Sequence, residues 1–217
     1  MAPVSVYNWT GCYIGGHVGG GWANKKWSDA GGTFFAPGTV LADHDPDGFL
    51  GGGQIGCDYQ TGPWVFGVEG QASWSNLEKD STFTIQFFGT IPITTRSEID
   101  FIATATGRVG YAFDRALIYA KGGVAWAHDK YSAFRSDGRL AASASDTPAG
   151  WTVGGGGEYA FAPNWSAKVE YNFIDFGTNR NTFTCTAAAA GLCVTAPIDI
   201  YQHIHTVKVG LNYRFRS

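Results

Sequence analysis

The feature that most constrains the fold is the alternation in the last stretch of the chain, residues 203–215. Apolar residues take every second position there, and polar or charged residues take the positions between them. This period of two is that of a β-strand with two chemically different faces. In a soluble sandwich the apolar face would point inward. In a small membrane barrel it would face lipid, and the charged face would line the interior. The number of times that the pattern recurs decides between these two arrangements.

The same alternation recurs along the chain and is interrupted mainly at Ile102 and Leu117. The predicted strands cover residues 9–22, 49–59, 64–74, 99–111, 118–126, 151–161, 165–173 and 203–215. The connections between them alternate between long polar segments and short turns. The long ones cover residues 24–47, 77–97, 127–150 and 177–200. Eight strands with this asymmetry predict an all-β fold, an antiparallel up-and-down transmembrane β-barrel with short periplasmic turns and long extracellular loops.

Composition is consistent with one sizeable domain, since 44% of the residues are hydrophobic and 15% are charged. A net charge of -3 and the lack of a basic run argue against a nucleic-acid surface. No apolar run of about 18 residues is present, which excludes a transmembrane helix. We expect residues 1–8 to form a periplasmic segment and residues 9–217 to form the barrel. No signal peptide is visible, and we expect the chain to begin after a cleavage site.

The polar faces of the predicted strands carry five acidic and five basic residues. They are Asp58, Glu69, Asp100, Glu158, Glu170, Arg108, Lys121, Lys168, Lys208 and Arg214. The interior of an eight-stranded barrel is only wide enough for side chains to fill it, so these charges are expected to pair across the lumen and plug it. The opposite faces carry aromatic residues near strand ends, where membrane-interface belts lie. They are Trp64, Trp74, Trp126, Trp151, Trp165 and Phe215.

Several stretches together resemble a known family of small outer-membrane barrels. They are NWTGCYIGG (8–16), GVEG (67–70), GRVGYAFD (107–114), GGGGEY (154–159), AKVEY (167–171) and HTVKVGLNYRF (205–215). The chain is similar to the opacity and 25/31-kilodalton surface antigens of α-proteobacteria, often labelled porin-like. The resemblance implies a Gram-negative outer-membrane location, a cleaved signal peptide, and roles in envelope integrity or surface contact.

The chain departs from this family at two points. The family usually ends in an aromatic residue that assists recognition by the barrel-assembly machinery, whereas Phe215 is followed by Arg216 and Ser217. Family members also usually carry an aromatic residue where this chain has Cys12 and Cys57.

The cysteines predict two disulfides. If Ile14 lies opposite Ile55 and Val18 opposite Gly51, then Cys12 lies opposite Cys57, and directly opposed residues approach disulfide distance. Cys185 and Cys193 bracket a short Ala-rich segment of the fourth long connection. Four cysteines in an exported protein favour two bonds, and free buried thiols are the alternative.

Other chemistry is weakly indicated. His203 and His205 share a strand face and could supply two metal ligands, but no third ligand is evident, and interfacial histidines are the favoured interpretation. We predict no cofactor, no metal and no catalytic residue. The leading hypothesis is a structural and surface-interaction barrel. The alternatives are a narrow porin-like channel, a barrel protease or acyl hydrolase, and a soluble calyx with an apolar interior.

The expected partners follow from that location. They are outer-membrane lipid and lipopolysaccharide, the barrel-assembly machinery, and a lateral homo-oligomer or other envelope proteins; no nucleic acid is expected.

Overall fold

The computed structural model describes the backbone of residues 7–29, 40–44, 47–86, 90–135, 140–182, 184–185 and 197–215. Side chains are described at residues 7–24, 47–76, 99–128, 147–178 and 201–215. No helix within these ranges is long and apolar enough to cross a membrane.

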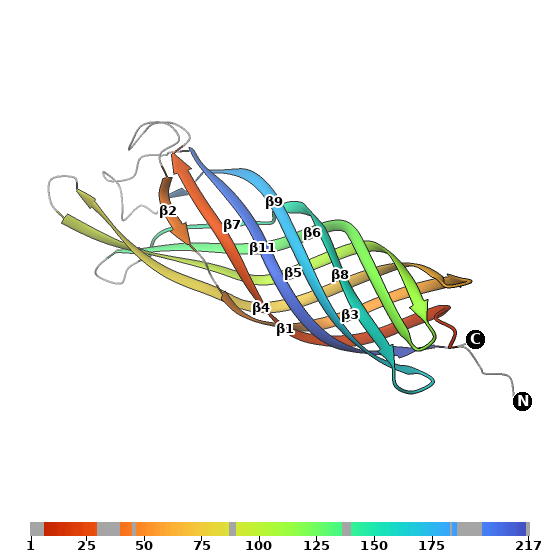
Figure 1. Ribbon diagram of the computed structural model, residues 1–217. Helices are drawn as coiled ribbons and strands as arrows, with labels where there is room; N and C mark the ends of the chain where they lie inside the picture. The colour runs from red at the N-terminus through yellow and green to blue at the C-terminus, as the bar shows by residue number, and fades with distance from the viewer. Residues whose placement is uncertain are drawn as a thin grey trace, which may run out of the picture.

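Within the described residues, eight long strands close into an antiparallel barrel (Figure 1). They are β1 (Gly11–Asp29), β3 (Asp47–Thr61), β4 (Trp64–Gln86), β5 (Thr90–Phe113), β6 (Ala116–Arg135), β8 (Ala149–Ala160), β9 (Trp165–Thr182) and β11 (Pro197–Arg214). Each strand pairs with the next along the chain, and β11 pairs with β1 to complete the circle. The predicted fold class is confirmed.

The two ends of the barrel differ as the alternating connections predict. Short turns join β3 to β4, β5 to β6, and β8 to β9, and we call this the turn end. The first residues of β1 and the last residues of β11 also lie there (Figure 1). The opposite end, the loop end, carries three further short strands, β2 (Val40–His44), β7 (Leu140–Asp146) and β10 (Thr184–Cys185).

The prediction that residues 77–97 form a long loop was wrong. β4 and β5 stay paired well beyond the barrel wall, through Phe83 opposite Ile93 to Gln86 opposite Thr90, and they extend outward in Figure 1. Residues 81–95 are rich in Thr, Ile and Phe, which favour strands, so the ladder continues after the amphipathic wall ends. The strands adjoining the other long connections also run further than predicted, for example β6 to Arg135.

Asp100 lies at an irregularity of β5. The register between β5 and β6 shifts between Ile99 and Phe101, and Ile99 is buried although the alternation predicts it on the outward face. An extra residue at a bulge leaves the ladder and interrupts the alternation of faces. Asp100 is accordingly only half-buried, unlike the other predicted interior charges.

Candidate functional site: the barrel interior and its wall

The barrel interior gathers charged residues from most of the strands. Nine of the ten charges predicted to face inward are almost fully buried, Asp100 being the exception. They are Asp58, Glu69, Glu158, Glu170, Arg108, Lys121, Lys168, Lys208 and Arg214. Buried charges are tolerated only when they are paired and hydrogen-bonded, so the contacts among them decide what the interior can do.

Four of these residues form a closed ring of alternating charge, which we call the four-charge ring. The ammonium of Lys121 lies 3.0 Å from Glu69 Oε1 and 2.7 Å from Glu170 Oε1. The ammonium of Lys168 lies 2.8 Å from Glu69 Oε2 and 3.3 Å from Glu170 Oε2. Each lysine therefore bridges both carboxylates, and β4, β6 and β9 are linked across the lumen.

Neutral side chains complete the ring. The hydroxyl of Tyr13 donates to Glu69 Oε2 at 2.7 Å, and that of Tyr119 donates to Glu170 Oε2 at 2.9 Å. The amide of Gln71 donates to one oxygen of each carboxylate, and its own oxygen accepts from Lys208 at 2.7 Å. The carboxylates thus accept bonds from several sides, which is the arrangement that offsets the desolvation of buried ions.

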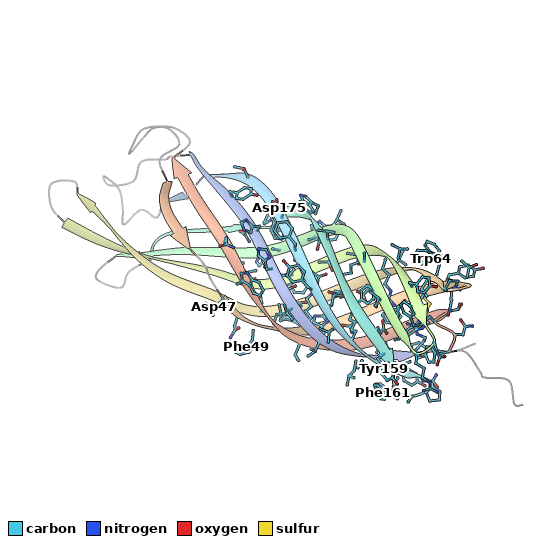
Figure 2. The ribbon with its side chains drawn as sticks, viewed as in Figure 1. Asp47, Phe49, Trp64, Tyr159, Phe161 and Asp175 are labelled. Carbon is cyan, nitrogen blue, oxygen red and sulfur yellow. A yellow bond between two sulfur atoms is a disulfide. The ribbon has the colours of Figure 1, made fainter. Side chains whose placement is uncertain are left out.

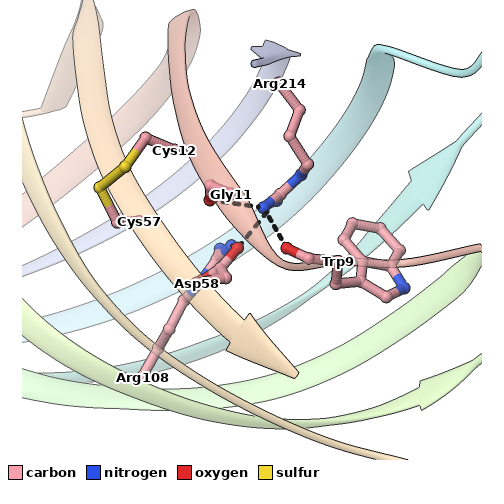
Figure 3. The surroundings of a disulfide bond; sticks show 7 residues. All are labelled: Trp9, Gly11, Cys12, Cys57, Asp58, Arg108 and Arg214. Atoms are coloured by element: carbon pink, nitrogen blue, oxygen red, sulfur yellow. Dashed lines mark hydrogen bonds and ion pairs between the residues drawn. A yellow bond between two sulfur atoms is a disulfide. The ribbon is translucent and has the colours of Figure 1, made fainter. Parts of the chain in front are cut away.

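A second cluster, the arginine cluster, lies toward the turn end and contains Asp58, Arg108, Glu158 and Arg214. Arg108 forms a two-point contact with Asp58 and reaches Glu158 at 3.2 Å. Arg214 Nη2 lies 2.8 Å from Asp58 Oδ2, a contact drawn in Figure 3. Arg108 also lies 4.0 Å from Glu69, so the two clusters are continuous.

An apolar layer lies inside the barrel at the turn end. It consists of Tyr7, Trp9, Val65, Ala112, Leu117, Tyr119 and Ala160. Trp9 precedes β1 and has no exposed surface. Its indole N–H donates to the carbonyl of Asp114 at 3.0 Å, its backbone N–H donates to Gln60 Oε1 at 2.7 Å, and Arg214 lies over its ring. The chain then passes through Gly11, where φ is 135° and a Cβ would lie 2.6 Å from the carbonyl oxygen of Phe215.

A second apolar layer lies inside the barrel toward the loop end. It consists of Ala23, Ile99, Ile102, Ala125, Ala127, Ile174, Phe176 and Ile204. Between this layer and the four-charge ring, His17 bonds to Gln54 and lies 2.8 Å from the hydroxyl of Ser73. The interior is therefore stacked as apolar layer, charged middle and apolar layer.

The sequence analysis did not predict either apolar layer, although Ile102 and Leu117 indicated them by interrupting the alternation. Both residues break the alternation because each belongs to an apolar layer inside the barrel. Trp9 gave no such signal, because it precedes the first ladder pair of β1 with β3 or β11.

The outward face is apolar and carries two aromatic belts. Trp64, Trp165 and Phe215 lie at the turn end, as do Tyr159 and Phe161, while Trp74, Trp126 and Trp151 lie toward the loop end. Figure 2 labels Trp64, Tyr159 and Phe161 at the turn end. All six predicted interface aromatics are exposed. At about 3.3 Å per residue and a tilt of about 40°, the stretch from Trp64 to Trp74 rises about 25 Å, the height of the apolar band of a transmembrane barrel.

A disulfide links β1 to β3 on the outward face near the turn end (Figure 3). Cys12 lies opposite Cys57, Ile14 opposite Ile55 and Val18 opposite Gly51, which is the predicted register. The second predicted bond, Cys185–Cys193, lies outside the described residues because Cys193 does.

The described histidines do not assemble a metal or catalytic centre. His203 and His205 lie in an aromatic cluster on the outward face, where Trp22 stacks on His205 and Tyr171 hydrogen-bonds to it. Within the described residues, no three His, Cys, Asp or Glu side chains are placed to hold a metal ion. His17 and Ser73 hydrogen-bond to each other as a base and a nucleophile would, and both side chains are buried inside the barrel.

Comparison with known proteins agrees with this fold. Residues 1–215 match the family described as outer membrane protein beta-barrel domain. The chain is 32% identical to the 31 kDa outer-membrane immunogenic protein of Brucella melitensis, over 99% of this chain and 87% of that protein. It is 29% identical to the 25 kDa outer-membrane immunogenic protein of Brucella abortus, over 99% and 84%, and 29% identical to a 22 kDa outer membrane protein of Rhizobium leguminosarum, over 81% and 68%.

Solved structures share the fold at low sequence identity. The outer membrane protease OmpT of Escherichia coli superposes with a TM-score of 0.54 at 10% identity, covering 99% of this chain and 100% of that one. OprG of Pseudomonas aeruginosa gives a TM-score of 0.53 at 13% identity, covering 96% and 99%. Together with the family match and the Brucella relatives, these results show that the chain belongs to the outer membrane protein β-barrel family, among the small surface antigens of the Gram-negative outer membrane.

Proposed function

We propose that this protein is a structural and surface-interaction barrel whose lumen is sealed, and that it supports envelope integrity and presents its loop end outside the cell. The observation that carries the proposal is the stacking of the interior. A charged middle, whose carboxylates are each bound by two or more cations, lies between two layers of buried apolar side chains.

The two apolar layers support a sealed lumen more strongly than the charges do. A polar interior alone would be compatible with a thin water path, because charged rings line the pores of many channels. Here Trp9 and Leu117 fill the turn end, and Ile102 and Ile174 fill the interior toward the loop end, all with almost no exposed surface. Hydrated ions would have to cross both layers without hydrogen-bonding partners, which is costly.

The second candidate function is the narrow porin-like channel, which the nine buried charges of the middle favour. Planar-bilayer conductance separates the two. Purified barrel, shown to be folded by its altered gel mobility without boiling, is expected to give no discrete conductance steps. Reproducible steps would establish the channel and overturn the sealed lumen. The variant Trp9→Ala combined with Leu117→Ala, which thins the turn-end layer, tests whether that layer contributes to the seal.

The structural role has its own test in cells. A strain lacking the gene is expected to become sensitive to detergent, and the wild-type gene is expected to restore resistance. A version with β4 and β5 shortened by removal of residues 79–97 keeps the wall and should also restore resistance. Unchanged detergent sensitivity in the deletion strain would overturn the envelope role.

The proposed partners follow from the position of the barrel. They are outer-membrane lipid and lipopolysaccharide along the wall, the barrel-assembly machinery during biogenesis, and other envelope proteins or further copies of the chain. We assign no catalytic role and no cofactor.

A further inference from the structure

Lys208 differs from the other buried cations of the barrel interior. Lys121 and Lys168 each contact two carboxylates. The ammonium of Lys208 contacts no carboxylate among the described residues, and its one hydrogen bond there goes to the neutral side-chain oxygen of Gln71, at 2.7 Å. Lys208 is 2% exposed, and an ammonium has three N–H donors. Two donors of a buried charge therefore have no partner in the described part of the chain.

The nine buried charges of the interior leave one positive charge over. Four of them are carboxylates and five are cations, and every cation except Lys208 forms an ion pair with a carboxylate. Asp100, the remaining predicted charge, is only half-buried and lies at the β5 bulge, next to Ile99 of the loop-end apolar layer. Protonation of His17, which is also buried in the interior, would only add to the excess. A charge buried without a counterion is costly, so this excess requires compensation.

A second buried group near Lys208 has no partner. Thr104 lies directly opposite Gln71 in the β4–β5 ladder, and Gln71 is the residue that accepts from Lys208. Side chains directly opposed in such a ladder are neighbours, with Cβ atoms about 5 Å apart. Thr104 is 7% exposed, and its hydroxyl oxygen has no hydrogen-bond partner among the described residues. The hydroxyl of Thr104 and the ammonium of Lys208 therefore flank Gln71, and both have an unused donor.

The unpartnered hydroxyl of Thr104 lies at the boundary between the charged middle and the loop-end apolar layer. Thr106, the next inward residue toward the turn end, donates its hydroxyl to a backbone carbonyl of β4 at 3.3 Å. In the other direction, Ile102 belongs to the apolar layer and offers no polar side chain. The side-chain oxygen of Asn172, which is also unpartnered, points toward β8, where a Cβ on Gly154 would lie 2.5 Å from it. The unused groups next to Gln71 are therefore donors, and a buried group of this kind indicates a bound water or ion.

A small monovalent anion fits these donors better than water or a larger oxyanion. Water would accept the N–H bonds of Lys208 but would leave its positive charge uncompensated. Phosphate has four oxygens to satisfy and more negative charge than the excess of one, and Lys208 and Thr104 together offer only three unused donors. A halide ion accepts hydrogen bonds from any direction and carries the one negative charge that the interior lacks.

We propose that a chloride ion binds between the ammonium of Lys208 and the hydroxyl of Thr104, and that the barrel takes it up as it folds. The ion supplies the counter-charge of Lys208 and lies between the charged middle and the loop-end apolar layer. Binding at this site does not depend on whether the lumen conducts, so the halide test and the conductance measurement can fail separately.

The test refolds the purified full chain from urea at constant ionic strength, with bromide as the probe and with gluconate as a large anion for reference. Crystals of the barrel refolded in bromide should show an anomalous peak in contact with Lys208 Nζ and Thr104 Oγ1. In urea titrations in lipid vesicles, the folding equilibrium constant of the wild type should rise about tenfold for each tenfold increase of bromide above the dissociation constant, as for one bound ion.

Three variants locate the ion. Lys208→Met removes the charge and should abolish the dependence on bromide. Thr104→Val removes the unpartnered hydroxyl and should require about tenfold more bromide for the same stabilisation, as for the loss of one hydrogen bond. Thr106→Val is the matched control, because its hydroxyl already has an acceptor, and it should leave the dependence on bromide unchanged.

Anomalous peaks confined to the surface, or an equal dependence on bromide in the wild type and Lys208→Met, would overturn the proposal. Equal effects of Thr104→Val and Thr106→Val would also overturn it, because the ion would then not contact Thr104. If Lys208→Met fails to fold, the anomalous peak and the two threonine variants carry the test.

Discussion

Lys168 and Val169 are neighbours in β9, yet they face opposite surroundings. Lys168 is 2% exposed and contacts two carboxylates inside the barrel, whereas Val169 is 57% exposed on the outward face. Inward and outward side chains alternate in the same way along the other strands of the wall, apart from the irregularity at Asp100. Inside, a polar group is stable only because its partners are in place; outside, an apolar group needs no particular partner, because lipid supplies the contact. Substitutions on the two faces should therefore destabilise the protein for different reasons.

The largest expected effect is on the inner face. Glu170→Ala leaves Lys121 and Lys168 without a carboxylate that each now contacts, and removal of one partner from a buried ion pair costs about 3–5 kcal/mol. The measurement is the free energy of unfolding by urea in lipid vesicles. Val169→Ala, one residue away on the outer face, is the matched control and should cost under about 1 kcal/mol. Similar costs for the two variants would contradict the distinction between the faces.

The Cys12–Cys57 disulfide is a specific contact on the outer face, where apolar side chains otherwise need no particular partner. Replacing both Cys12 and Cys57 by Ser removes a link across a sequence separation of 45, which is expected to lower the free energy of unfolding by up to about 4 kcal/mol. Reduction of the wild type should reproduce the loss, with no further change in the double variant. Equal stability of oxidised and reduced wild type would show that the bond does not contribute.

A charge on the outer face should be costly where lipid surrounds it. Val68 lies near the middle of the band between Trp64 and Trp74, and Val68→Lys is expected to cost about 2–4 kcal/mol. Thr61→Lys, at the exposed turn, should be almost neutral. The same urea titration measures both, and a neutral Val68→Lys would mean that this face does not contact hydrocarbon.

The smallest effect concerns the neutral hydrogen bonds of the interior. Ser73→Ala removes a partner of His17 without removing a charge, and is expected to cost about 1–2 kcal/mol. A loss as large as that of Glu170→Ala would mean that the charged ring does not dominate the inner face.

The alternation of residue types was sufficient to predict the wall. Strand positions in the wall follow from it, because the period of two fixes which residues share a face. The register of β1 with β3 was an assumption that placed Cys12 opposite Cys57, and the structure has that register and the bond. The alternation was not sufficient at Asp100, because the position of a bulge depends on the neighbouring strand. It was also not sufficient at the loop end, because Thr-rich segments extend the β4–β5 ladder there without an apolar face that would indicate a strand.

The apolar layers that enclose the charges depend on contacts between distant parts of the chain. Trp9 packs with Leu117 and Ala160 in one cluster, and no local pattern at Trp9 indicates those neighbours. Ile102 and Leu117 were visible as exceptions to the alternation, but an exception does not say what it packs against.

The central claim is that charged faces point inward and apolar faces point to lipid, and tryptophan fluorescence tests it most directly. Two variants would each keep one tryptophan, Trp9 or Trp74, with the others replaced by Phe, and would be inserted into vesicles that contain brominated lipid. Trp74 is 66% exposed on the outer face and should be strongly quenched, while Trp9 has no exposed surface inside the turn end and should not be. Strong quenching of Trp9 with an unquenched Trp74 would show that the faces are inverted and would contradict the account.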